Sequence, residues 1–169
     1  MRILVSDTSV LIDLERGGLL ETAFRLPSEF AVPDLLYKRE LRDHNGPALQ
    51  RLGLRIEALD EAGVRLALAY QARSPALSLP DTFAITLAKV HGWVLLAGDA
   101  ALRRLAAAEE IEHHGVLWVL DQLLHQRQTN AQILQTALTL IAAHPRCRLP
   151  AREISERLDH YAQLTGGRR

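Results

Sequence analysis

Near its amino terminus the sequence reads Ile3-Leu4-Val5-Ser6-Asp7-Thr8-Ser9. The first three of these residues form a short apolar run, which is the pattern of a strand buried on both faces of a sheet. An acid, Asp7, follows the run at once, and the polar residues around it can cap a helix that we predict over residues 10–15. A buried strand that leads through an acid into a helix indicates an α/β unit.

The segment Trp93-Val94-Leu95-Leu96-Ala97-Gly98-Asp99 repeats this arrangement. We predict a buried strand over residues 93–96, then the acid, then a helix over residues 100–108. The same rules predict strands at 30–32, 54–59 and 116–119, a loop at 44–47, and helices at 19–26, 33–42, 61–72 and 82–91. Because strands alternate with helices, we expect an α/β fold with a central, mainly parallel sheet flanked by helices.

No repeat, low-complexity tract or linker divides the 169 residues. We therefore expect one domain over residues 1–164, which is enough chain for a sizeable core. Its core should span about residues 1–120. Three more helices, predicted near 121–126, 131–143 and 151–164, should form a C-terminal helical extension, and residues 165–169 should be a flexible tail.

The composition restricts the class of protein. The 20 basic residues balance the 20 acidic ones, so the chain lacks the overall positive charge that is common in nucleic-acid-binding proteins. The single cysteine, Cys147, excludes an internal disulfide and a cysteine metal site and suits a reducing compartment. No apolar run reaches the roughly 18 residues of a membrane span, and Asp7 comes too early for a signal peptide. We expect a cytoplasmic protein without membrane contact.

Four acids stand out as candidate site residues. Asp7 and Asp99 end two predicted strands, and the carboxyl ends of parallel strands meet at one edge of a sheet, where ligands bind. Glu40 and Asp81 lie on predicted helices that follow short strand or loop segments. Four carboxylates that converge there need a cation to stay ionised, and Mg²⁺ or Mn²⁺ is the kind of ion that oxygen ligands select. Such an ion can activate water and stabilise the leaving oxygen of a phosphodiester.

Each acid also has a structural interpretation. Asp7, Asp81 and Asp99 can be simple helix N-caps, and Glu40 can be a solvated helix residue. Other acids lie nearby and are not excluded by composition, namely Asp13, Asp34 and Asp43. The histidines form no i, i+4 pair of the kind that zinc favours, so we assign them no metal. Arg103, one turn after Asp99, is a candidate phosphate contact, with a solvated arginine as the alternative.

The order of these acids resembles that of PIN domains. The four segments that carry the resemblance are Asp7-Thr8-Ser9-Val10-Leu11-Ile12; Val32 to Leu41, with Glu40; Asp81 followed by Ala84, Ile85, Leu87 and Ala88; and Leu95 to Arg103, with Asp99. The resemblance covers about residues 1–120. It implies a three-layer PIN-like fold and a Mg²⁺- or Mn²⁺-dependent endoribonuclease that hydrolyses RNA, with Asp7, Glu40, Asp81 and Asp99 as catalytic and metal-binding residues.

Many bacterial and archaeal PIN proteins of this size look like VapC toxins, which are ribonucleases inhibited by a cognate antitoxin. The resemblance therefore also implies an antitoxin partner and a homodimer. It assigns Ser9 the role of orienting a metal ligand or the phosphate.

The chain departs from the family pattern in two places. Where the family often has Thr or Ser before the last aspartate, this chain has Ala97-Gly98, and the helical region after Ala131 exceeds a minimal PIN domain. The alternative function is thus a catalytically weak or inactive PIN-like binding or regulatory module. A haloacid-dehalogenase-type phosphatase is disfavoured because Ser9 occupies the place of its second aspartate. A receiver domain is disfavoured because Thr8 stands where its acidic pair needs a second acid.

Overall fold

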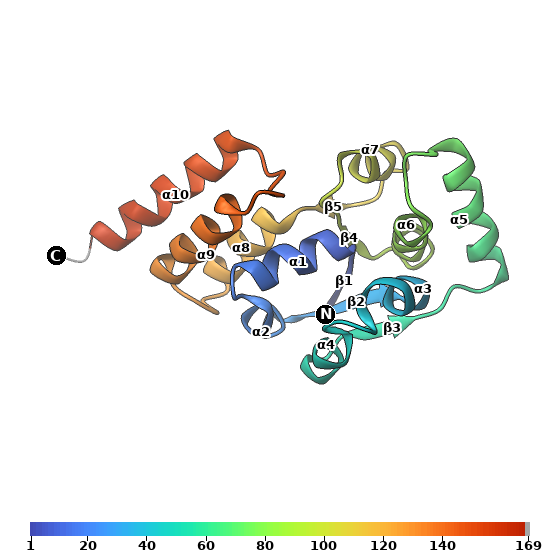
Figure 1. Ribbon diagram of the computed structural model, residues 1–169, viewed down its shortest axis with the longest axis horizontal. Coiled ribbons are helices and arrows are strands. Elements are labelled where there is room, and N and C mark those ends of the chain that lie inside the picture. Colours follow the sequence, from blue (N-terminus) through green and yellow to red (C-terminus); the bar gives the residue numbers. More distant parts are fainter. Residues whose placement is uncertain (168–169) are drawn as a thin grey trace.

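The central sheet has five strands in residues 1–167, the part of the chain that the computed structural model describes. The strands are β1 (Arg2–Ser6), β2 (Ser28–Pro33), β3 (Arg55–Glu57), β4 (Val94–Leu96) and β5 (His113–His114). They lie in the order β3-β2-β1-β4-β5, and each neighbouring pair is parallel. The structure confirms the predicted α/β fold with a parallel sheet between helices (Figure 1).

The helices lie on both faces of this sheet. They are α1 (Thr8–Arg16), α2 (Leu20–Ala23), α3 (Asp34–Leu36), the π-helix η1 (Tyr37–Leu41), α4 (Gly46–Leu52), α5 (Glu61–Arg73), α6 (Leu79–His91), α7 (Ala100–Ala108), α8 (Val116–His125), α9 (Ala131–Ala143) and α10 (Ala151–Gly166). Helices α5, α6 and α7 lie on one side, and α1, α8, α9 and α10 lie on the other (Figure 1).

Successive strand residues contribute to two different apolar clusters. Leu4 and Leu96 belong to the cluster that includes α1, α8 and α9, whereas Val5 and Leu95 belong to the cluster beneath α5, α6 and α7. Side chains of a strand alternate between the two faces of a sheet, so a strand buried on both faces needs an uninterrupted apolar run. This is why the sequence around β1 and β4 is apolar throughout.

The functional edge of the sheet follows from its topology. The chain passes from β1 outward to β2 and β3, then returns to place β4 and β5 on the other side of β1. The order of strands therefore reverses between β1 and β4, and the loops at their carboxyl ends diverge there, as at ligand sites of open α/β sheets. The backbone N–H of Asp7 donates to the carbonyl of Leu96 at 2.9 Å, which joins the two strand ends.

The predicted strand at residues 116–119 is wrong. These residues form the first turns of α8, and the last strand is the two-residue β5, which pairs with β4. The buried residues Val116, Val119, Leu120 and Leu123 have helical spacing, but the first four residues alone read equally well as a buried strand. The histidines of β5 gave no apolar signal of a strand.

Four other local predictions need correction. Helix formation in residues 19–26 is confined to Leu20–Ala23, and the predicted loop at 44–47 already contains the start of α4. The helix predicted at 33–42 is divided into α3 and the π-helix η1. Of the predicted flexible tail, Thr165 and Gly166 instead complete α10, while residues 168–169 lie outside the described residues.

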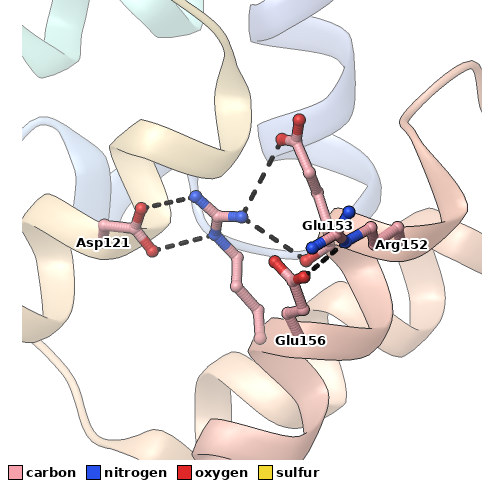
Figure 2. Close-up of polar contacts among 5 residues, drawn as sticks. Asp121, Arg152, Glu153 and Glu156 are labelled. Atoms are coloured by element: carbon pink, nitrogen blue, oxygen red, sulfur yellow. Dashed lines mark hydrogen bonds and ion pairs between the residues drawn. The ribbon is translucent and has the colours of Figure 1, made fainter.

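An ion pair and buried apolar side chains hold the C-terminal helices to the rest of the chain. Leu134 and Leu138 of α9 lie in the same apolar cluster as residues of α1 and α8. Arg157 of α10 donates from Nε and Nη2 to the two carboxylate oxygens of Asp121 on α8, at 2.9 and 2.6 Å (Figure 2). Tyr161, one turn further along α10, is fully buried. None of the helices in residues 1–167 is both long and apolar enough to cross a membrane.

Candidate active site

Asp7 is the most buried acid at the carboxyl edge of the sheet, with 2% of its surface exposed. It is the N-cap of α1, and its Oδ1 accepts from the backbone N–H of Val10 at 2.9 Å. Its Oδ2 accepts from the backbone N–H of Gly98 at 2.7 Å, and the Ser9 hydroxyl lies 2.9 Å from both oxygens. Three donors thus serve a carboxylate that can accept about four hydrogen bonds, so one acceptor position remains for a cation.

Burial determines the charge state of Asp7. Loss of hydration raises the pKa of its carboxyl to about 6, against the opposing hydrogen bonds from Val10, Gly98 and Ser9. The negative charge of Asp81 adds a smaller increase to this pKa. The donors around Asp7 are neutral, so a bound cation is what would favour its ionised form most strongly.

Asp81 connects the four acids electrostatically. Burial is the main cause that raises the pKa of the Asp81 carboxyl, and the charges of Glu40 and Asp99 raise it further. The Ser78 side chain partly offsets these effects. Since Asp81 also acts on Asp7, all four candidate acids lie near enough to one another for their charges to interact through Asp81.

The four acids reach this edge in different ways. Asp7 and Asp99 are both helix N-caps, and the backbone N–H of Leu102 donates to Asp99 Oδ1 at 3.0 Å. These two residues therefore cap a helix and also belong to the acidic group. Asp81 is not a cap, because Ser78 caps α6. Glu40 lies in the π-helix η1, where Arg42 N–H donates to the carbonyl of Tyr37, five residues back, at 2.8 Å. Such a turn is wider than an α-turn and re-aims its side chains, and it is frequent at functional sites.

Within residues 1–167, no three His, Cys, Asp or Glu side chains are already gathered closely enough to hold a metal ion. The ligand types nevertheless suit Mg²⁺ or Mn²⁺, because the group offers hard carboxylate oxygens and no nitrogen or sulfur donor. The Asp7 carboxylate, which has one acceptor position left after its three hydrogen-bond donors, fits the same ions.

The profile of the DUF3368 family, described as a PIN domain, matches residues 3–163. The chain belongs to this family. Its match extends into α10, well beyond the first 120 residues on which the motifs lie. PIN domains are generally nucleases that use divalent metal ions.

A solved structure gives the same fold for this PIN domain. A PilT N-terminus domain protein, SSO1118, from the hyperthermophilic archaeon Sulfolobus solfataricus P2 is 14% identical, with a TM-score of 0.53. The superposition covers 73% of this chain and 94% of that protein. No protein with a curated description matched the sequence.

The two predicted accessory residues of the PIN domain have different surroundings. Ser9 contacts both carboxylate oxygens of Asp7, as described above, and its role in orienting a metal ligand or the phosphate stays a prediction. Arg103 is half-buried, and its Nη1 lies 3.7 Å from the position that a Cβ on Gly115 would occupy, over the amino end of α8. It pairs with no acidic side chain in residues 1–167, and a role in binding phosphate stays a prediction.

Two residues that sequence reasoning missed hold the acids in place. The Thr8 hydroxyl donates to Glu40 Oε2, across 32 residues of sequence. A Cβ at Gly98 would lie only 2.1 Å from Ser9 Oγ, so Gly98 must be glycine for Ser9 to keep its position on Asp7. The Ala97-Gly98 departure from the family pattern thus has a reason at Gly98, where any side chain would collide with the Ser9 hydroxyl. Thr8 gave one usable signal, since it lies between two predicted site residues.

Proposed function

We propose that this PIN domain is a Mg²⁺- or Mn²⁺-dependent endoribonuclease that hydrolyses phosphodiester bonds of RNA. The observation that carries the proposal is the group formed by Asp7, Glu40, Asp81 and Asp99, whose charges interact with one another and are balanced by no basic side chain in the interactions described above. A buried acid that serves only stability is usually paired with arginine or lysine. Acids held together without such a partner indicate a place for a cation.

The chain's own residues perform three tasks in this proposal. Ser9 and Gly98 fix the Asp7 carboxylate and leave one acceptor position open. Thr8 orients Glu40 toward the same edge, and Asp81 and Asp99 supply the remaining oxygens. A bound Mg²⁺ or Mn²⁺ supplies Lewis-acid stabilisation of the charge that develops on the phosphate. Arg103, half-buried on α7, is our candidate to pair with a phosphate oxygen.

A VapC-type toxin, inhibited by a cognate antitoxin and acting as a homodimer, is the biological role that we propose. The PIN-type order of its acids supports it. Helix α9 presents two exposed aliphatic side chains seven residues apart, Ile133 and Leu140, which a second copy or a partner protein would cover. Light scattering at tens of micromolar tests the dimer, and a monomer at that concentration contradicts it.

The alternative is a PIN-like module with weak or no catalysis that binds or regulates. The absence of a side-chain hydroxyl at Ala97 and Gly98 and the net charge of zero favour it. The two functions differ in one measurement, which is metal-dependent cleavage by pure protein.

The test uses single-stranded RNA and purified protein with Mg²⁺ or Mn²⁺. We expect cleavage that excess EDTA stops, and a loss of at least about 100-fold in Asp81→Asn, because metal-assisted stabilisation contributes several kcal/mol to the transition state. Asp81 suits this test better than Asp7 because it caps no helix. The matched control is Asp43→Asn, since Asp43 is exposed and pairs only with its neighbour Arg42.

Two outcomes contradict the proposal. Undiminished cleavage in EDTA removes the metal mechanism, and no cleavage of any RNA favours the binding module. A thermal melt adds an independent readout, because an ion that binds only the folded state raises its stability. Mn²⁺ should stabilise wild type and Asp43→Asn, and should stabilise Asp99→Asn and Asp81→Asn much less.

A further inference from the structure

A groove of about 620 Å³ runs along α1 beside the acidic edge. One of its walls is a single face of α1, formed by Thr8, Leu11, Ile12 and Glu15 at helical spacing. The other wall runs from Glu40 in η1 to Asn45, just before α4. Thr8 and Glu40 are bonded to each other, so the groove is continuous with the acidic group rather than a separate cavity.

The groove combines an apolar floor with a polar rim. Leu11 and Leu41 are almost fully buried beneath it, and Ile12 leaves 37% of its surface exposed. The rim carries the exposed imidazole of His44 and the amide of Asn45, which donates to Glu15 Oε2 at 3.2 Å. A volume in the range of about 300–1,000 Å³ is typical of sites for small molecules, so the groove can hold a flat ring with its polar edge.

The charge of the groove selects what can enter it. Its only charged side chains are the carboxylates Glu15 and Glu40, which would repel a phosphate. A neutral nucleobase meets no such repulsion, and an unstacked base of single-stranded RNA is commonly held by an aromatic or imidazole ring and read along its Watson–Crick edge. The phosphate attached to that base would then lie at the acidic edge, where the Mg²⁺ or Mn²⁺ ion of the proposed function would offset the charge of the carboxylates.

The donors and acceptors at the rim favour one base. A carboxylate accepts two adjacent N–H groups, and among the four bases only guanine presents two side by side, at N1 and N2. The Asn45 amide, which already lies beside Glu15, can donate to guanine O6. We propose that the groove binds one unstacked guanine of the RNA substrate next to the cleaved phosphate, with Glu15 and Asn45 reading its edge and His44 stacking on its ring. This proposal rests on the proposed nuclease function.

Binding is tested without catalysis, by NMR titration of the ¹⁵N-labelled, metal-free protein in EDTA with the RNA trinucleotides UGU, UAU, UCU and UUU. We expect UGU to shift the amide signals of Ile12, His44 and Asn45 and to bind about tenfold or more tightly than the others, which is the usual discrimination of a two-bond base contact. Glu15→Gln should reduce that preference about tenfold. Glu21→Gln, an exposed glutamate on α2, should leave it unchanged.

A second arm maps cleavage sites in an RNA of random sequence with Mn²⁺. Guanine should flank the cut, and His44→Ala should weaken this preference, whereas His125→Ala, at the far end of α8, should not. Equal binding of the four trinucleotides, or cleavage with no base preference, overturns the guanine site and leaves the nuclease function standing. A UGU preference without cleavage of any RNA retains the site and removes the function. A further titration uses a short peptide of arginine and leucine residues. If these amide signals shift with the peptide and with none of the trinucleotides, the groove binds a protein partner and the proposal is overturned.

Discussion

Asp7 and Asp121 are both carboxylates held by hydrogen bonds on both of their oxygens, but their partners differ. Asp121 receives two bonds from the guanidinium of Arg157, which carries a full positive charge. Asp7 receives its bonds from two backbone N–H groups and a hydroxyl, all neutral, and the charge of Asp81 acts on it. The first arrangement joins helices α8 and α10. The second leaves a carboxylate whose negative charge a bound cation would balance.

This difference shows how an acid with a structural role can be told from an acid of a site. Both residues accept two or more bonds, so the number of bonds does not separate them. The charge of the donors does, because a neutral donor offsets only part of the cost of burying a carboxylate. The comparison can be strengthened or broken at three places.

The largest expected effect is the pH dependence that Asp7 gives the metal-free protein. The pKa of Asp7 is about 6 in the folded chain and 3.8 in a free carboxyl, so the folded state binds the proton more tightly. The contribution of Asp7 to the free energy of unfolding is therefore full below about pH 4. It falls as the pH rises to about 6, by up to about 3 kcal/mol in all. Denaturant unfolding in EDTA from pH 4 to pH 8 measures this fall.

The control for the pH experiment is Asp7→Asn, which cannot ionise. Its stability should vary less over the same range, even though it loses an acceptor for the Gly98 N–H. Equal pH profiles in the two proteins would show that Asp7 is ionised in the folded state without a cation. Mn²⁺ should restore the stability of wild type above pH 6, because it favours the ionised form.

A smaller effect is expected from Gly98→Ala. The new Cβ would lie 2.1 Å from Ser9 Oγ and would force the hydroxyl away from Asp7. A lost hydrogen bond and local overpacking together cost about 2 kcal/mol. Thermal unfolding of Gly98→Ala, Ser9→Ala and the double variant measures the coupling. The double variant should lose less than the sum of the single losses, and simple additivity would mean that the two residues do not share this contact.

The smallest effect is expected on the Asp121 side of the comparison. Arg157→Ala should cost about 1 kcal/mol of stability, since the bond is bidentate but partly exposed, and RNA cleavage per folded molecule should be unchanged. Arg152→Ala is the matched control, because Arg152 likewise lies on α10 and pairs with an acid, Glu156 (Figure 2). Its side chain is 89% exposed, unlike that of Arg157. This substitution should cost less than about 0.5 kcal/mol. Reduced cleavage by fully folded Arg157→Ala protein would give the C-terminal helices a direct part in catalysis.

Much of the fold was predictable because its signals are local. The apolar runs before Asp7 and Asp99 identified two buried strands, and the helices over residues 61–72, 82–91 and 100–108 were placed within a few residues. The strand predicted at residues 116–119 was wrong for a physical reason, because four apolar residues fit a buried strand and a buried helix equally well. The π-helix at Glu40 was not predicted, because no local sequence pattern indicates a single extra residue in a helical turn.

The sequence by itself determined which acids end strands and which begin helices, because periodicity and capping act over a few neighbouring residues. Only the tertiary structure decided which of them meet. Gly98 donates to Asp7 across 91 positions, and Thr8 donates to Glu40 across 32. The first contact exists because β1 and β4 are adjacent in the sheet, although most of the α/β units lie between them in the chain. The second exists because β2, which leads through α3 into η1, lies on the other side of β1. Strand adjacency follows from how whole helices and strands pack, which no short stretch of sequence records.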